Sequence, residues 1–330
     1  MVASFVVLCG DAATEAPIRL LAIGNLISIT GTWMQLVAQN LLVLRLTGST
    51  ALLGACVALQ AAPSALGGLF GGVLADRVSR RELLVATQLA WITLTASVGV
   101  LVATGTVEAW MLLGGAVVSG LIAAVEGPAN AAFTPELVPP EDLPNAIALG
   151  SAVNGAGRVL GMALAGVVIA AAGTSTVFLL NALSFVGVLA ALRLMRTSEI
   201  HATPRAARES SQLRSALRYL AGATRLRWAI VLAFWLSLFG RNFQVTIAAM
   251  TEGPLGVGAG GYGVASTAFA LGALVGAVFA ARFAFPALRL LVVAGLVAGA
   301  LQTGAALAPG LPEFVAAMVP IAAGWRPIAA

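Results

Sequence analysis

The segment Gly67-Gly-Leu-Phe-Gly-Gly-Val-Leu-Ala-Asp-Arg77 decides the fold, because it recurs later in the chain as Gly272-Ala-Leu-Val-Gly-Ala-Val-Phe-Ala-Ala-Arg282. Alternate positions of the two copies are identical, at one constant offset of 205 residues. Each copy ends a hydrophobic run long enough for a membrane helix. The second span therefore corresponds to the eighth, which predicts two parallel halves of six helices around a central binding site.

The chain as a whole is also strongly apolar. Of its 330 residues, 60% are hydrophobic and only 9% are charged, whereas a soluble domain carries about a quarter charged residues. A hydrocarbon layer about 30 Å thick needs about 20 consecutive apolar residues for each spanning helix. Such runs predict an all-α membrane protein in a lipid bilayer, with about nine full spans and one partial span: 18–46, 52–74, 83–104, 110–133, 143–172, 177–195, 228–250, 262–285, 288–307 and a short 314–325.

The net charge of +5 does not indicate a nucleic acid partner, because the basic residues follow the topology of the spans. Every basic residue other than His201 is Arg, and Arg gathers in alternate connections: Arg77, Arg80 and Arg81, then Arg193 through Arg227, then Arg282 and Arg289. The opposite connections hold Glu108, Glu252 and Glu313, and only Arg45 goes against the pattern. We expect a cytoplasmic N-terminus and, since the Arg- and Ala-rich composition without Lys suggests a GC-rich bacterial genome, the bacterial inner membrane.

The longest polar stretch divides the chain into two bundles. We expect an N-terminal tail at 1–17, a six-helix bundle at 18–195, a cytoplasmic linker at 196–227 and an incomplete bundle of helices 7 to 10 at 228–330. Carried forward by the same offset, the repeat predicts two further spans that end at about residue 400. We therefore expect a C-terminally truncated chain.

The loop after the second span carries the first family signature. Gly72-Val-Leu-Ala-Asp76-Arg77-Val-Ser79-Arg80-Arg81 resembles the loop motif of the major facilitator superfamily, with Ser79 where the pattern has Gly. The resemblance implies a conformational latch made by Gly72, Asp76, Arg77, Arg80 and Arg81. The alternative is an Arg-rich anchor that only holds the loop inside.

Further motifs narrow the resemblance to one branch. Gly31-Thr-Trp-Met-Gln35, Glu126-Gly-Pro-Ala129, Pro135-Glu-Leu-Val138 and Phe178-Leu-Leu-Asn-Ala-Leu-Ser-Phe185 are similar to the transmembrane secretion effectors, the branch of enterobactin-exporter-type permeases. This resemblance implies export of a small organic solute driven by proton entry. The branch usually has Arg and Gln after Pro-Ala, but here Asn130 and Ala131 follow, so any charge pair made by that Arg is absent.

The fifth span is rich in glycine. Gly155-Ala-Gly157-Arg158-Val-Leu-Gly161-Met162-Ala-Leu-Ala-Gly166 resembles the glycine-rich antiporter motif, with Met162 where Pro is common. Small residues at this spacing share one helix face and allow close packing against a partner helix across the bundle. We expect Gly157, Gly161 and Gly166 to pack closely, although such packing is also general in membrane helices.

Three charged residues of the predicted spans are candidates for a functional role, Glu126, Arg158 and Arg241, because a charge at membrane depth costs about 2.5–3.5 kcal/mol on insertion scales. Glu126 could carry one proton per cycle, or it could lie at the interface beside Pro128. Arg158 and Arg241 could bind an anionic solute, pair with Glu126, or extend toward the interface.

Polar amides in otherwise apolar spans could line a transport cavity. They are Asn25, Gln35, Gln39, Asn40, Asn242 and Gln244. No nucleotide-binding loop, catalytic carboxylate pair or metal-ligand spacing is present, so we expect no enzyme activity, no cofactor and no metal. The sequence therefore predicts a monomeric, proton-coupled secondary exporter of drug-like or siderophore-like molecules. The alternative is a truncated protein that transports nothing, or a membrane scaffold.

Overall fold

The computed structural model describes residues 16–194, 222, 243–280 and 288–329. Its first half contains five helices, labelled α2 (Ala16–Thr47), α3 (Thr50–Arg77), α4 (Arg80–Ala103), α5 (Ala109–Phe133) and α6 (Leu143–Leu194). Two short 3-10 turns, η2 (Thr134–Glu136) and η3 (Pro140–Asp142), connect α5 to α6. The six spans predicted for this half are helical, and their ends lie within a few residues of the prediction. The all-α membrane fold is confirmed.

Helix α6 contains two of the predicted spans. Its 52 residues would form a straight rod of about 78 Å, far longer than a bilayer is thick. The rod is broken at Gly173, whose φ of 81° lies in a region that residues with a Cβ rarely adopt. Gly173 falls between the predicted spans 143–172 and 177–195, so it is the turn between the fifth and sixth spans.

The second half contains α9 (Phe243–Glu252), α10 (Gly258–Ala280), α11 (Leu288–Ala306) and α12 (Leu311–Ala329). Helix α12 has 19 residues and extends beyond the predicted partial span 314–325 at both ends. Its apolar part, Leu311–Ala323, is shorter than the about 20 residues that a full span needs. The predicted seventh span, 228–250, is described only from Phe243, and the linker 196–227 lies outside the described residues apart from Gly222.

The helices of the first half expose large apolar side chains. Leu66 and Phe70 on α3 are 74% and 78% exposed, and Leu183 on α6 is 66% exposed. Within the described residues, five helical segments are long and apolar enough to cross a membrane: Ile23–Thr47, Thr50–Gly68, Arg80–Ala103, Ala109–Glu136 and Leu143–Leu194. These outward-facing side chains are therefore suited to contact with lipid.

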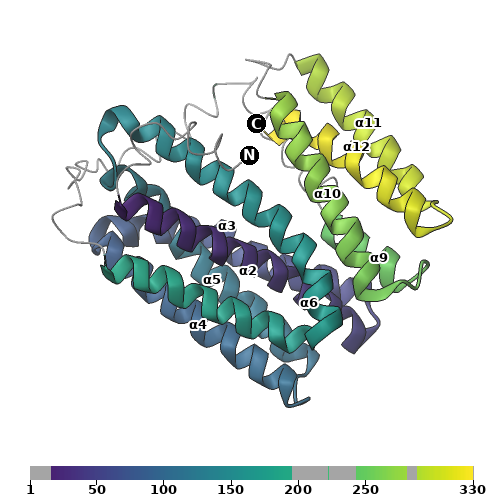
Figure 1. Ribbon diagram of the computed structural model, residues 1–330, viewed down its shortest axis with the longest axis horizontal. Coiled ribbons are helices and arrows are strands. Elements are labelled where there is room, and N and C mark those ends of the chain that lie inside the picture. Colours follow the sequence, from purple (N-terminus) through teal and green to yellow (C-terminus); the bar gives the residue numbers. More distant parts are fainter. Residues whose placement is uncertain (1–15, 195–221, 223–242, 281–287, 330) are drawn as a thin grey trace.

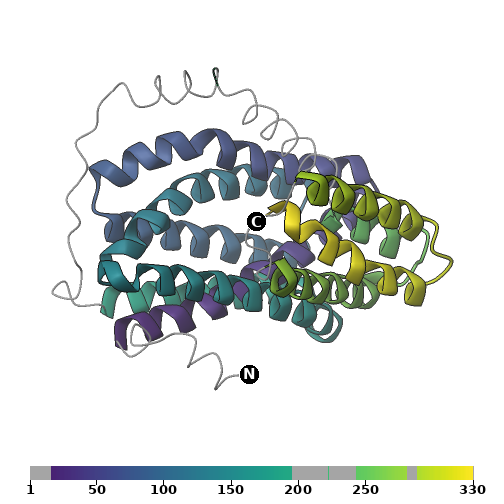
Figure 2. The same cartoon turned by 90° about the horizontal axis from the view of Figure 1, so that it is seen from above.

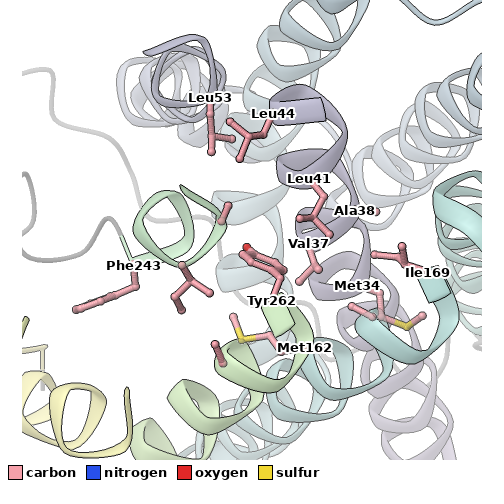
Figure 3. Close-up of a cluster of buried hydrophobic side chains, with 14 of the residues drawn as sticks. Met34, Val37, Ala38, Leu41, Leu44, Leu53, Met162, Ile169, Phe243 and Tyr262 are labelled. Atoms are coloured by element: carbon pink, nitrogen blue, oxygen red, sulfur yellow. The ribbon is translucent and has the colours of Figure 1, made fainter. Parts of the chain in front are cut away.

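The two halves lie side by side as two groups of helices (Figures 1 and 2). In the first group α2 packs mainly on α6 and α3 on α5, while in the second α10 packs on α12. The groups meet where α10 contacts α6 and α9 contacts α2. A buried apolar cluster there joins Val37 and Leu41 of α2 to Phe243 of α9 and Tyr262 of α10 (Figure 3).

The charged connections separate the two ends of the bundle. Because successive spans alternate in direction, Arg80, Arg81 and Arg193 lie at one end, which we call the basic end. The C-terminal end of α2 with Arg45, the start of α5 and the α9–α10 connection lie at the other end, which we call the outer end. The helix contacts between the two halves through Tyr262 and Leu41 lie toward the outer end.

Candidate functional site

A cavity of about 530 Å³ lies in the first half, toward the basic end. This volume is within the range of small-molecule binding sites. Its described lining residues come from α2, α4, α5, α6 and the turns that follow α5; they are Asn25, Ser28, Ile29, Thr32, Trp33, Leu84, Gln88, Trp91, Glu126, Asn130, Ala131, Phe133, Thr134, Leu137, Val138, Ala146, Leu149, Gly150, Val153, Asn154, Phe185, Val188 and Leu192. The described walls therefore belong to the first six spans alone.

Glu126 is held in this cavity by two side chains of α4. Gln88 donates a hydrogen bond from Nε2 to one carboxylate oxygen at 2.7 Å, and Trp91 donates from Nε1 to the other at 2.8 Å. Gln88 and Trp91 are three residues apart, so both face α5 from one side of their helix. Among the described residues that line the cavity, Glu126 alone carries a charge.

Gln88 is left with one unsatisfied atom. Its side chain is buried, with 4% exposure, and its Oε1 has no hydrogen-bond partner among the described residues. The amide cannot turn round without loss, because a carboxylate only accepts and the Nε2 group is needed for Glu126. An unsatisfied buried acceptor costs about 1–3 kcal/mol. Few buried polar atoms in a protein lack a partner, and this one, Oε1 of Gln88, lies beside the carboxylate of Glu126.

Aromatic side chains form much of the remaining wall. Trp91 stacks on Phe185 of α6, with ring centroids 5.6 Å apart and planes 12° from parallel. Trp33 of α2 lies beneath the guanidinium of Arg158, whose Cζ is 5.7 Å from the ring centroid. Among the described residues no ion pair joins Arg158 to Glu126, whose carboxylate accepts from Gln88 and Trp91.

The amides expected to line a cavity divide into two groups. Asn25 lines the cavity, but Gln35, Gln39 and Asn40 are buried elsewhere, toward the outer end, and join helices to one another. Gln35 accepts from Asn181 of α6 at 2.7 Å, Gln39 donates to Cys56 of α3 at 3.2 Å, and Asn40 donates to Tyr262 of α10 at 3.4 Å. A buried amide needs a partner, and these three find theirs in neighbouring helices rather than in a solute.

The glycines of α6 lie at close contacts with two different helices. A Cβ at Gly157 would lie 2.7 Å from Ile29, and one at Gly161 would lie 2.7 Å from Cβ of Trp33. The absence of a side chain at both positions therefore allows α2 to pack closely against α6. Gly166 instead meets the second half, because a Cβ at Gly263 of α10 would lie 2.7 Å from its Cα. The close approach of the two halves therefore depends on Gly166 and Gly263. Only Gly166 was predicted from the sequence as a packing residue.

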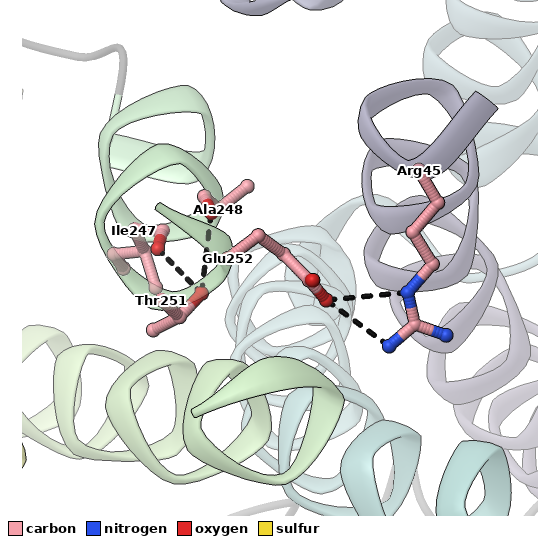
Figure 4. A network of polar contacts seen from close by, with 5 residues as sticks. All are labelled: Arg45, Ile247, Ala248, Thr251 and Glu252. Atoms are coloured by element: carbon pink, nitrogen blue, oxygen red, sulfur yellow. Dashed lines mark hydrogen bonds and ion pairs between the residues drawn. The ribbon is translucent and has the colours of Figure 1, made fainter. Parts of the chain in front are cut away.

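An ion pair closes the outer end of the same interface. Arg45 at the end of α2 donates from Nε and Nη2 to one oxygen of Glu252 in α9, at 3.3 and 3.1 Å (Figure 4). Arg45 was the one arginine that opposed the charge pattern, and its partner explains its position.

The pair of Arg45 and Glu252 is expected to stabilise the contact between the halves only modestly. The two side chains are 46% and 20% exposed, and exposed pairs contribute about 0.2–1 kcal/mol. A double-mutant cycle of Arg45→Ala and Glu252→Ala, measured as unfolding free energy in detergent, should show a coupling of about 0.2–1 kcal/mol. Strictly additive single changes would show that the pair contributes nothing.

The loop expected to act as a latch is tied to the first half. Arg80 donates to the carbonyl of Ala132 at 3.0 Å and forms an ion pair with Glu136. Arg81 donates to the carbonyls of Leu192 and Arg193 at 2.8 and 3.1 Å, at the C-terminus of α6 where carbonyls lack helical partners. These contacts hold α4 to the ends of α5 and α6.

Other residues of the loop motif differ from the expectation. No atom lies within 4 Å of a Cβ placed at Gly72, and the close approach to α5 is made by Gly71, which faces the carbonyl of Ala124. Arg77 is exposed. Ser79 replaces the glycine of the motif and caps α4 by accepting from the backbone N–H of Glu82. The side chain of Asp76 lies outside the described residues.

Other predicted positions cannot be placed. Arg241 and Asn242, and the side chain of Gln244, lie outside the described residues.

The structure adds Gln88, Trp91, Trp33 and Asn130 to the cavity, none of which was predicted as a site residue. The spacing of Gln88 and Trp91 on one face of a span was the available signal. Asn130 stands where the resembling branch usually has Arg.

Comparisons with known proteins agree with this architecture. A family model described as transmembrane secretion effector matches residues 13–330. No curated protein matches the chain. Among solved structures, the chain is similar to a bacterial homologue of the human lysosomal transporter Spinster, inward-facing and unoccupied, with TM-score 0.66 and 18% identity over 94% of this chain and 73% of that chain.

Two further solved structures share the fold. A D-xylose–proton symporter gives a TM-score of 0.70 and 14% identity over 94% of this chain and 79% of that chain. An inward-facing bacterial homologue of the iron transporter ferroportin gives 0.67 and 17% over 95% of this chain and 81% of that chain. Likeness at these identities shows the fold alone, which is the expected major facilitator fold.

Proposed function

Because the chain belongs to the transmembrane secretion effector family of major facilitator transporters, we propose that it is a proton-driven secondary exporter of small organic molecules. One observation supports this function above the others: a carboxylate, Glu126, lies in a cavity of about 530 Å³ whose other described lining residues are uncharged. A charge at membrane depth is costly and marks a functional position by default. Glu126 is the proposed proton carrier.

The arrangement of the two ends supports one-sided access to this cavity. At the outer end the halves are in contact through Gly166 and Gly263, through Asn40 and Tyr262, and through Arg45 and Glu252. The cavity lies toward the basic end, which the positive-inside rule assigns to the cytoplasm. We assign the structure to the state that loads solute from the cytoplasm, in a bacterial inner membrane, with the N-terminus inside and one chain as the transport unit.

The export cycle follows from this assignment. Solute enters from the cytoplasm, the contacts of the outer end open as the basic end closes, and solute leaves on the other side. Proton entry through Glu126 would return the protein to the first state, so the proton gradient supplies the free energy. Arg80 and Arg81 keep the helices around the cavity together in both states, because their bonds lie within the first half.

Efflux of three fluorescent probes tests this function: ethidium as a cation, Nile red as a neutral molecule and 8-anilinonaphthalene-1-sulfonate as an anion. Bacterial cells that make the chain are expected to lose at least one probe faster than cells with empty vector. Collapse of the pH gradient with nigericin should remove the difference. Efflux of all three probes at the empty-vector rate, or faster efflux that survives nigericin, would contradict proton-driven export.

A further inference from the structure

The electrostatic character of the cavity indicates which solutes it can accept. Glu126 carries the one charge among the described lining residues, and it is negative. Arg158 lies over Trp33, and among the described residues it forms no ion pair with the carboxylate. Asn130 lies one helical turn after Glu126 on α5 and also lines the cavity, and it is neutral. The described cavity therefore carries an uncompensated negative charge.

The bonds that hold Glu126 leave it able to receive a cation. Trp91 and Gln88 occupy one site on each carboxylate oxygen, whereas an ionised carboxylate can accept about four hydrogen bonds. A protonated amine would fill the vacant positions with a charge-assisted hydrogen bond. The unpaired Oε1 of Gln88 is a second acceptor beside the carboxylate, and a small rotation of the amide would offer it to another N–H of the same ligand.

The aromatic walls suit the apolar part of such a ligand. Trp91 and Phe185 form a stacked pair, and Phe133 lines the same space. Aromatic faces attract cations electrostatically and pack against apolar groups. An anion would gain nothing from these faces and would be repelled by Glu126. A carboxylate between aromatic walls therefore favours a ligand with one positive charge and bulky apolar substituents.

We propose that the cavity around Glu126 binds organic monocations, namely protonated amines with aromatic substituents, and that Glu126 is their counter-ion. This inference rests on the proposed export function, since it names the class of solute that the same site would carry. One carboxylate would then serve the amine and the proton in turn, which would couple release of one to binding of the other.

Three ligands of nearly the same shape and different charge distinguish an effect of ligand charge from an effect of ligand size. At pH 7 dibenzylamine is a cation, dibenzyl ether is neutral and 2-benzyl-3-phenylpropanoate is an anion. Binding to the purified chain in lipid nanodiscs is measured by quenching of tryptophan fluorescence, since Trp33 and Trp91 both line the cavity, and empty nanodiscs correct for partition into lipid. The amine is expected to bind at least about tenfold more tightly than the ether, and the anion most weakly.

Two variants assign this preference to the cavity. Glu126→Gln removes the charge, and Asn130→Arg adds a cation one turn away; both should reduce the preference for the amine to about twofold or less while the ether still binds, which shows that the fold is intact. Glu82→Gln removes an exposed carboxylate at the same end of α4 and should keep the preference. Equal binding of amine and ether by the native chain, tighter binding of the anion, or a preference unchanged in both cavity variants would overturn the proposal.

The outcome is independent of whether the protein exports by proton exchange. Proton-driven efflux without any preference for the amine would overturn the cation class and leave the proposed function standing. A preference for the amine that depends on Glu126, in a protein that drives no probe across the membrane, would support the cation class and contradict the proposed function.

Discussion

Glu126→Gln is expected to abolish proton-driven uphill transport while it leaves passive exchange of solute across the membrane in place. A glutamine of the same size can still accept from Trp91, and its amide can donate to the unpaired Oε1 of Gln88. The fold and the cavity should therefore persist. Glutamine cannot take up and release a proton, so the gradient would no longer drive the cycle.

The measurement compares two assays on one proteoliposome preparation. Uptake of the best-transported probe against its gradient, driven by a pH difference, should fall to the level of empty liposomes, whereas exchange of labelled for unlabelled probe without a pH difference should continue. Glu82→Gln is the matched control, since it removes a carboxylate that is exposed and lies outside the cavity. Uphill transport by Glu126→Gln at the native rate would remove Glu126 as the proton carrier.

Gly263→Leu is expected to prevent closure of the outer end and to separate the two halves there. Even a Cβ at this position would lie 2.7 Å from Cα of Gly166, and backbone cannot move aside as a flexible side chain can. Forcing extra atoms into a packed contact costs typically about 1–3 kcal/mol. A shift of that size changes the ratio of the closed and open states by about 5- to 150-fold.

Spin labels at Thr50 and Pro254, on exposed positions of the outer end in the two halves, report the change by pulsed electron paramagnetic resonance, with the native cysteines replaced by serine. The distance between labels should lengthen in Gly263→Leu. Gly260→Leu lies on the same helix with no atom within 4 Å of its Cβ position, and it should leave the distance unchanged. An unchanged distance in Gly263→Leu, in a protein that still elutes as one folded species, would show that this crossing does not govern closure.

The helices could be predicted from the sequence because each depends mainly on its own composition. A run of apolar residues without charge forms a helix in lipid wherever it lies in the chain, since every backbone group must be satisfied internally. The glycine face of α6 was predictable for the same reason, because residues at 157, 161 and 165 share a face by spacing alone. Helix α12 begins before the predicted partial span because Pro312 and Glu313 are part of its first turn.

The partners of the polar groups could not be predicted, because they depend on distant parts of the chain. Gln35 is paired with Asn181, 146 residues away, and Arg45 with Glu252, 207 residues away. Spacing within a helix shows that an amide is buried, but not whether it faces a solute or another helix. Three amides considered as possible cavity-lining groups are hydrogen-bonded to side chains of neighbouring helices. Glu126 was identified because a lone carboxylate in a span is conspicuous, while its donors Gln88 and Trp91 became evident only when α4 and α5 were placed together.

Proton movement coupled to probe movement is the most direct test of a proton-driven exporter. Proteoliposomes that contain the purified chain and enclose the pH indicator pyranine receive ethidium or Nile red on the outside, with no initial pH difference. The native chain is expected to move protons opposite to the probe, so that the interior becomes more alkaline as probe enters, and Glu126→Gln should give no pH change. Probe entry without any proton movement by the native chain would contradict proton-coupled export.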